Sequence, residues 1–373
     1  MHTMIQNHHP TLPDRRRLLM GAASFAAGCM AAPTASWSQT PSKPVVIADM
    51  HAHLGLHDRQ KFPGDLAAEM RANSATLVSW TLSNDAPWLV VTPTGIEQRA
   101  VPTSAELLAY FEKRFGEMAA YAQRSQLSVV KTVADVDRAI AGQPSVVFAS
   151  EGADFLGGQV SALGKAFDMG LRHLQLVHYI RSLVGDHSTE APMHGGLSAM
   201  GRELIQACEQ MGILVDLAHC SDAALTQALQ VTKKPMVWSH GWVEGDGGSY
   251  QDRYGFLKRR LSVAQARKIR DRGGVIGLWG LGLDRPGLGW SVSRRDPQGY
   301  GRELAKLINL LGPDAVALGT DISGVGDNWS VGSYADVRKV IEFLEMQKLD
   351  AATIEKVASL NFARVLKATL PTT

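Results

Sequence analysis

Short, mainly apolar runs alternate along the chain with longer segments in which apolar residues recur at helical spacing. Brief apolar runs of this kind are typical of parallel strands that are buried on both faces. We therefore predict eight strands, at residues 45–50, 75–81, 145–150, 171–177, 213–218, 235–239, 274–280 and 315–320.

Helical patterns fill the intervals between most of these strands and close the chain. They cover residues 103–124, 133–141, 160–169, 197–211, 222–230, 262–272, 302–311, 334–347 and 351–368. Strands that alternate with helices in this way predict a (βα)8 barrel of the TIM type, formed as one catalytic domain by residues 40–373. An open doubly wound sheet is the alternative, but no Gly-x-Gly-x-x-Gly turn follows the first strand, which disfavours a nucleotide-binding version.

Residues 84–100 interrupt the alternation. Pro87, Pro93 and Gly95 lie around the apolar residues 88–92, a pattern that suits a hairpin inserted after the second strand. Such a hairpin could form a lid or specificity element at the site. The alternative is an insertion that only packs against the rest of the fold.

The first 39 residues predict an export signal that is removed from the mature protein. Arg15-Arg16-Arg17-Leu18-Leu19 precedes a short run of small and apolar residues, 20–32. The paired arginines favour the twin-arginine route, and hence a periplasmic or secreted protein. The run is too short and too rich in Ala and Gly to favour a membrane anchor, so no integral membrane protein is expected. Lipid attachment at Cys29 is the alternative for this segment.

Composition adds little beyond these exclusions. The 373 residues are 45% hydrophobic and 20% charged, as in an ordinary globular protein. The signal contains three arginines and one aspartate, so its removal takes the formal net charge from +2 to zero, and no nucleic-acid partner is expected. Only Cys208 and Cys220 remain, too few for a disulfide framework, and we interpret Cys220 as a small packed residue.

Polar residues follow the predicted strands at the end where a barrel builds its active site. Nine histidines remain after residue 39, and five of them lie at the carboxyl ends of strands. A carboxylate ends the third strand and another follows the eighth. These candidates for one shared site are His51, His53, Glu151, His178, His219, His240 and Asp321.

Imidazole and carboxylate side chains are the ligands that Zn²⁺ and similar divalent ions prefer. His51 and His53 alternate at a strand end, so both point to one side and can bind the same ion. Five His or Glu ligands plus an aspartate exceed one tetrahedral site and suit two metals. Glu151 is the natural bridge, and Asp321 is placed to accept a proton from the attacking water.

Several blocks of sequence resemble the membrane (renal-type) dipeptidase family of the amidohydrolase superfamily. The most specific is Gly196-Leu-Ser-Ala-Met-Gly-Arg-Glu-Leu204 with Met211-Gly-Ile-Leu-Val-Asp-Leu-Ala-His219. Others are Glu151-Gly152, Gly170 to His178, Pro235 to His240, Gly319-Thr-Asp321 and Asn361 to Leu366. They run in the family's order over residues 45–367.

The resemblance implies a barrel with two zinc ions per chain that hydrolyses dipeptides, and often a homodimer. His51 matches a ligand of the first metal, Glu151 the bridging carboxylate, and His219 and His240 the ligands of the second metal. His178 matches a histidine that contacts substrate and stabilises the tetrahedral intermediate, and Asp321 matches the acid/base aspartate. Arg260 matches the arginine that binds the substrate carboxylate, with Arg259 as the fallback because residues 241–254 look longer than the family's loop.

The chain departs from the family pattern at three places. His53 stands where the family has aspartate, Gly241 follows His240 in place of serine, and Ser323 replaces the second aspartate near Asp321. These departures are compatible with a metal site, for zinc or for another divalent metal. They affect the expected specificity for dipeptides. The alternatives are an amidohydrolase acting on another small amide, lactam or ester, and a non-catalytic binding protein on the same scaffold.

Overall fold

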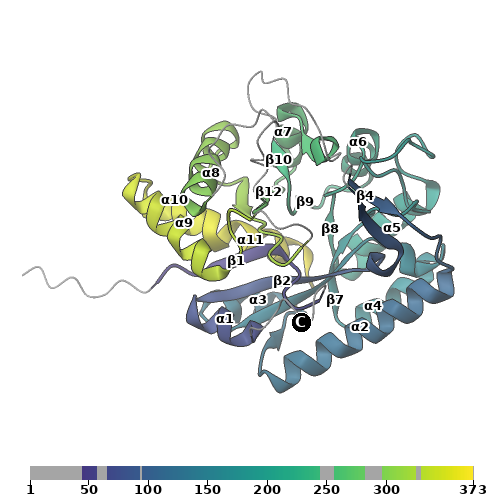
Figure 1. Ribbon diagram of the computed structural model, residues 1–373, viewed down its shortest axis with the longest axis horizontal. Coiled ribbons are helices and arrows are strands. Elements are labelled where there is room, and N and C mark those ends of the chain that lie inside the picture. Colours follow the sequence, from purple (N-terminus) through teal and green to yellow (C-terminus); the bar gives the residue numbers. More distant parts are fainter. Residues whose placement is uncertain are drawn as a thin grey trace, which may run out of the picture. The chain divides into compact units, whose positions relative to one another are not determined.

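Eight parallel strands pair side by side until the last meets the first, which closes the sheet into a barrel (Figure 1). The computed structural model describes residues 44–56, 65–92, 95–243, 256–281, 296–324 and 329–372. In barrel order the strands are β1 (Ile47–Ala52), β2 (Ala75–Ser83), β6 (Ser145–Glu151), β7 (Leu171–Gln175), β8 (Leu214–Asp216), β9 (Val237–Trp238), β12 (Val275–Leu278) and β13 (Val316–Leu318).

The longest ladder of the barrel joins β2 to β6. β2 pairs with β6 over seven residues, from Leu77 opposite Ser145 to Ser83 opposite Glu151. The short strand β5 (Ser128–Val129) pairs with the first two residues of β6. β7 pairs with β6 further along the strand, from Phe148 onward. Every residue of β1, β2 and β6 is buried, as expected for strands covered on both faces. The eight predicted strands and the closed (βα)8 fold are confirmed.

Helices surround the strands in Figure 1. They are α1 (Leu66–Ala72), α2 (Ser104–Arg124), α3 (Val133–Ile140), α4 (Leu163–Asp168), α5 (Ala199–Met211), α6 (Asp222–Val231), α7 (Val263–Asp271), α8 (Pro297–Leu311), α9 (Tyr334–Met346), α10 (Ala351–Glu355) and α11 (Asn361–Thr369). Local signals fix several ends. Thr103 and Glu106 form a capping box at the start of α2, and Gly212 ends α5 with φ 75°.

The differences from the pattern-based expectation include three helical segments. α1 was not predicted, because its seven residues are too few to show helical periodicity. α8 begins five residues before the predicted start, where Asp296 caps the helix and Pro297 occupies its first turn. The last predicted helix is divided by a π-helical turn, Lys356–Leu360, after which the Asn361 side chain donates to the carbonyls of Pro313 and Val316.

The segment at residues 84–100 contains the expected hairpin. A short 3-10 turn, Ala86–Trp88, leads into β3 (Leu89–Thr92), which pairs antiparallel with β4 (Gly95–Gln98). A second small pairing joins β10 (Trp242–Val243) to β11 (Arg260–Leu261), directly after the 3-10 turn Phe256–Arg259.

From residue 44 onward, the described residues form one compact unit. The export signal at residues 1–39, Cys29 and the loop at 244–255 lie outside the described residues. Within the described ranges, none of the helices combines the length and apolarity needed to cross a bilayer.

Candidate active site

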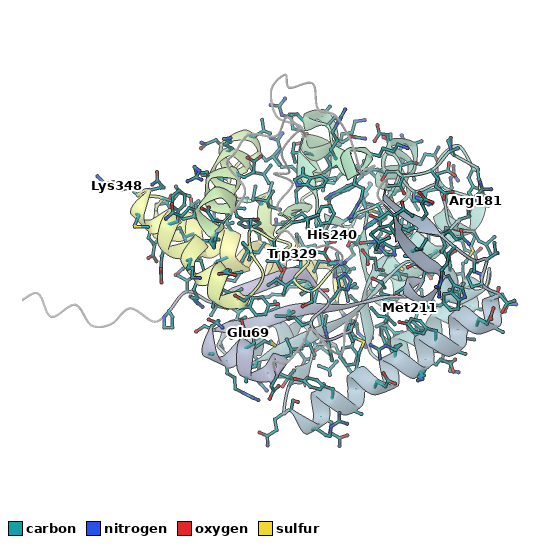
Figure 2. All side chains as sticks on the ribbon, in the orientation of Figure 1. Glu69, Arg181, Met211, His240, Trp329 and Lys348 are labelled. Carbon is teal, nitrogen blue, oxygen red and sulfur yellow. The ribbon has the colours of Figure 1, made fainter. Side chains whose placement is uncertain are left out.

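A pocket opens at the carboxyl ends of the barrel strands, where the sequence predicts a site. It contains about 330 Å³ of empty space, counted to its open mouth. Six strands, β1, β6, β7, β8, β9 and β13, or the turns after them, supply the seven candidate residues. Among described residues, its walls are His53, Ser83, Ile96, Glu151, His178, Tyr179, His219, His240, Arg259, Trp279 and Asp321. Figure 2 shows His240 in the interior among the strands, whereas Lys348 lies on the outside.

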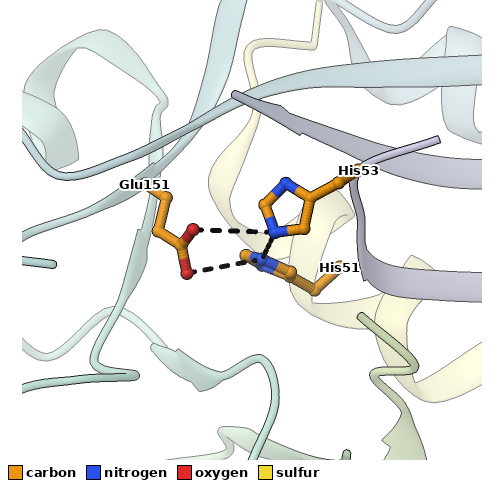
Figure 3. Close-up of side chains that lie close together, drawn as sticks. All are labelled: His51, His53 and Glu151. Carbon is orange, nitrogen blue, oxygen red and sulfur yellow. Dashed lines mark hydrogen bonds and ion pairs between the residues drawn. The ribbon is translucent and has the colours of Figure 1, made fainter. Parts of the chain in front are cut away.

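The first candidate ligand set lies at the end of β1. The Nε2 atoms of His51 and His53 are 3.2 Å apart. Glu151 faces both rings, with Oε1 3.6 Å from His51 Nε2 and Oε2 3.6 Å from His53 Nε2 (Figure 3). The side chains that the sequence places a hundred residues apart therefore converge on one point.

The second set lies on the other side of Glu151. The Nε2 atoms of His219 and His240 are 3.3 Å apart. Glu151 Oε1 lies 3.1 Å from the first of these atoms and 3.6 Å from the second. Both sets share the one carboxylate, as expected of a bridging ligand.

These spacings fit a metal ion. Tetrahedral ligands held about 2.0–2.1 Å from zinc lie roughly 3.3 Å from one another, which is the separation within both sets. Burial, with neighbouring positive groups, lowers the pKa values of His51, His219 and His240 well below their usual range. Neutral imidazoles are the form that binds metal. Among the described residues, three triads of histidine and carboxylate side chains are close enough to hold an ion, and two of them contain Glu151.

Hydrogen bonds to a backbone carbonyl and to a buried aspartate hold the candidate ligands of β1 in place. His53 Nδ1 lies 2.7 Å from the Thr81 carbonyl, which leaves Nε2 facing the cluster. Asp49 accepts the amides of His51 and Thr320, which ties the end of β1 to the loop that carries Asp321.

Asp216 performs the corresponding task between the next pair of ligands. It accepts the amides of Ala218 and Ser239, and so joins the end of β8 to the end of β9. His240 Nδ1 also lies 2.9 Å from the Ser239 hydroxyl. Buried aspartates therefore position both ligand-bearing strand ends.

Two site residues have left-handed backbone conformations that only glycine adopts freely. His219 has φ 67° and Asp321 has φ 57°. Such conformations cost energy and are concentrated at functional sites, where the surrounding structure enforces them. The sequence carries no signal of this strain.

Two glycines near the site, Gly241 after His240 and Gly324 after Ser323, leave no room for a side chain. Gly241 has φ 154°, and a Cβ there would lie 2.3 Å from Trp238 Nε1. A Cβ at Gly324 would lie 2.6 Å from both carboxylate oxygens of Asp321. Glycine at both positions keeps the site's neighbours at their observed distances.

Asp321 is held by one oxygen and faces the ligand cluster with the other. Its Oδ2 accepts a hydrogen bond of 2.7 Å from Trp279 Nε1. Its Oδ1 lies 2.9 Å from His53 Nε2 and 3.7 Å from His51 Nε2. Burial disfavours protonated His53, but Asp321 and Glu151 raise its pKa overall.

The arginine of the pocket is Arg259. Its side chain is 3% exposed, donates to the Tyr179 hydroxyl at 3.2 Å and to His240 Nε2 at 2.6 Å, and lies 4.2 Å above the Trp279 ring. Arg260 begins β11, is partly exposed and is not among the pocket's described walls. The structure therefore places the fallback residue, and not the one first matched by register, at the site.

His178 faces the site, and its ring is held by Asp85, a residue that the sequence analysis did not identify. Its Nδ1 lies 2.5 Å from Asp85 Oδ1, and its Nε2 lies 3.1 Å from Glu151 Oε2. Burial opposes protonation, but Asp85 and Glu151 raise the pKa of His178. Asp85 also accepts the amides of Tyr179 and Ile180.

The hairpin segment thus contributes to the site directly. Asp85 precedes β3, and Ile96 of β4 forms part of the pocket wall. Ser83, at the end of β2, donates to Glu151 Oε2 at 2.6 Å. The hairpin signal found this segment, but nothing in its pattern singled out these side chains.

Other histidines and the cysteines lie away from the pocket walls. His173 is buried within β7, 2.7 Å from the Ser79 hydroxyl, and His187 and His194 contact residues of their own loop. His57 lies outside the described residues. Cys208 and Cys220 are free and buried, and burial raises the pKa of Cys208 to about 12. Both fit the interpretation as packed residues.

Comparison with known proteins adds a family match. A family model described as membrane dipeptidase (Peptidase family M19) matches residues 107–372. Dipeptidase tcpJ of Claviceps purpurea is 26% identical over 237 residues, which are 61% of this chain and 51% of that protein. Dipeptidase aclJ of Aspergillus oryzae is 34% identical over 100 residues, 26% of this chain and 24% of that protein. The matched part of the chain thus spans about half of the first relative and less of the second.

A solved structure shares the fold. A metallo peptidase from Rhodobacter sphaeroides, liganded with a phosphinate mimic of the dipeptide L-Ala-D-Ala, matches with a TM-score of 0.71 and 19% identity. The match covers 88% of this chain and 100% of that chain. At this identity the likeness establishes the barrel architecture.

Proposed function

Because the chain belongs to the membrane dipeptidase family, Peptidase family M19, we propose that it is a metal-dependent hydrolase that cleaves the amide bond of dipeptides. The family membership confirms the resemblance seen in the sequence motifs. The observation that carries the proposal is the convergence of two histidine pairs on Glu151, with the Asp321 carboxylate beside them.

We propose two zinc ions per chain. His51 and His53 would hold one, His219 and His240 the other, and Glu151 would bridge them. Ions bound there would supply Lewis-acid activation of water and of the scissile carbonyl. The spacing of the donor atoms and the neutral state of His51, His219 and His240 support this assignment.

The chain's own side chains then have separable tasks. Asp321 takes the proton of the attacking water on Oδ1, which faces the cluster, and returns it to the leaving amine. His178 Nε2 stabilises the oxyanion, with its ring held by Asp85. Arg259 binds the substrate carboxylate through its guanidinium fork, which Tyr179 helps to hold.

Part of the pocket wall is apolar. Trp279, Tyr179 and Ile96 form apolar parts of its wall, and the first two are less than 5% exposed. An apolar wall strengthens the electrostatic contacts made inside it.

His53 supports a second candidate function. An imidazole in place of a carboxylate removes one negative charge from the first ligand set, and the metal there is expected to be a stronger Lewis acid. The substrate panel therefore also includes lactams, esters and small amides that are not dipeptides.

Two further proposals concern the whole protein. We propose twin-arginine export to the periplasm or medium, supported by Arg15 to Arg17 and the short apolar run after them. Homodimerisation stays a prediction of the resemblance, which light scattering of the purified mature protein tests.

Metal analysis of purified protein and hydrolysis of a dipeptide panel test the main proposal together. The Rhodobacter structure holds a mimic of L-Ala-D-Ala, so this dipeptide and L-Ala-L-Ala lead the panel. About two ions per chain and turnover that Asp321→Asn abolishes are expected. Two ions with turnover of lactams or esters only would favour the second function, and no metal after supplementation would refute the catalytic proposal.

A further inference from the structure

Trp279 lies directly after β12 and contacts two side chains of the site at once. It is 2% exposed and forms part of the pocket wall. Its indole N–H points to Asp321, and its ring face lies under Arg259. One rigid side chain therefore connects the proposed acid/base group to the proposed carboxylate anchor.

In the contact with Asp321, Trp279 is the hydrogen-bond donor and the carboxylate is the acceptor. An indole N–H donates and never accepts, so it can only hold a carboxylate oxygen. The 2.7 Å bond fixes Oδ2 and leaves Oδ1 directed at His53 and His51. Because Asp321 has a left-handed backbone, a side-chain anchor of this kind helps to determine where its carboxylate lies.

The contact with Arg259 uses a different part of the ring. The guanidinium carbon lies 4.2 Å from the Trp279 ring centroid, within the range of a cation–π contact. Tyr179 holds the same guanidinium from another side through its hydroxyl. Contact with the ring face restricts where the planar guanidinium can lie, which favours one position of its fork for a carboxylate.

We propose that Trp279 is a positioning residue for both catalysis and substrate binding, its N–H aligning Asp321 and its ring face aligning Arg259. The inference rests on the proposed function of these two residues. The two roles are separable, because phenylalanine keeps a ring face and lacks the N–H, whereas leucine lacks both.

Steady-state kinetics on the metal-loaded enzyme test the roles. Trp279→Phe is expected to lower kcat about tenfold, the effect of one hydrogen bond to a charged group, with KM within about twofold of wild type. Trp279→Leu is expected to lower kcat similarly and also to raise KM about fivefold or more. Trp242→Phe is the matched control, since Trp242 packs on Trp279 with ring centroids 4.7 Å apart but is absent from the pocket wall. Equal kcat in wild type and Trp279→Phe, or the same losses in Trp242→Phe, would overturn the proposal.

A second measurement does not depend on turnover. In a ¹⁵N-indole NMR spectrum, the resonance that disappears in Trp279→Phe belongs to Trp279. Its proton is expected downfield in the wild type, because it bonds to a carboxylate, and it should move upfield in Asp321→Ala. If it stays in place, the Asp321 contact is refuted even in an active enzyme. If it moves while no dipeptide is hydrolysed, the contact stands and the proposed function fails.

Discussion

The assignment of the substrate anchor to Arg259 makes a prediction in which the neighbouring arginine is the control. Arg259→Met keeps most of the stem's volume and removes the charge and the fork. The side chain is buried against Trp279 and Tyr179, so a bound carboxylate meets it away from water. Arg260→Met removes the same charge one residue further along, from a partly exposed side chain.

The magnitude follows from the type of bond that is lost. A hydrogen bond to a charged group contributes about 1.5–3 kcal/mol, and a fork that makes two such bonds lies near the upper end. Since about 1.4 kcal/mol corresponds to a factor of ten, kcat/KM for a dipeptide should fall about 100-fold in Arg259→Met. Arg260→Met should change it less than about threefold, as expected of a surface substitution.

The assay compares a dipeptide with its C-terminal amide, which lacks the carboxylate. Wild type should prefer the acid by about the same 100-fold, and Arg259→Met should lose this preference because both substrates then lack a partner. Metal content is measured in parallel, because Arg259 also contacts His240. Full retention of the preference in Arg259→Met, or its loss in Arg260→Met, would show that the carboxylate is bound elsewhere.

Three further predictions follow from the described contacts. Burial raises the pKa of Asp154 to about 7 from 3.8, so its carboxyl stays protonated in the folded protein at pH values where the unfolded chain ionises. Between about pH 4 and pH 7, Asp154 alone should therefore lower the free energy of unfolding by roughly 4 kcal/mol, a contribution that Asp154→Asn lacks. Urea unfolding of both proteins across this range measures the difference between them. A difference that is constant with pH would contradict this pKa. His53→Ala should lower the bound metal from about two ions to about one per chain, whereas His178→Ala should leave the metal content unchanged. Metal analysis that shows equal losses in the two variants would place His178 among the ligands. Asp85→Ala should lower kcat about tenfold or more with metal content preserved, because His178 loses the carboxylate that holds its ring, and an unchanged kcat would restrict Asp85 to loop structure.

The barrel and the positions of the candidate metal ligands were predictable because each rests on a local pattern. Buried parallel strands read as apolar runs, and the residue types after them match a metal site. Glu151 and His219 could therefore be placed without knowledge of the fold's details. α1 escaped prediction because seven residues give too little periodicity, and the π-helical turn at Lys356–Leu360 has the composition of an ordinary helix.

The residues that support the ligands could not be found in this way. Trp279 follows an apolar strand and has the pattern of a core residue, and Asp85 has the pattern of a turn residue. The choice between Arg259 and Arg260 depends on the path of the turn that precedes β11, which adjacent identical residue types do not reveal. Each of these assignments requires knowledge of which distant segments meet at the pocket.

The left-handed backbone at His219 and Asp321 limits how far this protein can be stabilised by sequence changes that preserve its activity. A non-glycine residue in that region costs about 1–2 kcal/mol, which glycine avoids and asparagine reduces. Selection for thermal resistance alone would therefore favour glycine or asparagine at both positions. Each such change would remove an imidazole from the ligand cluster or the carboxylate beside it. A heat-resistant but inactive barrel is the expected outcome of screening this chain for stability without an assay for turnover.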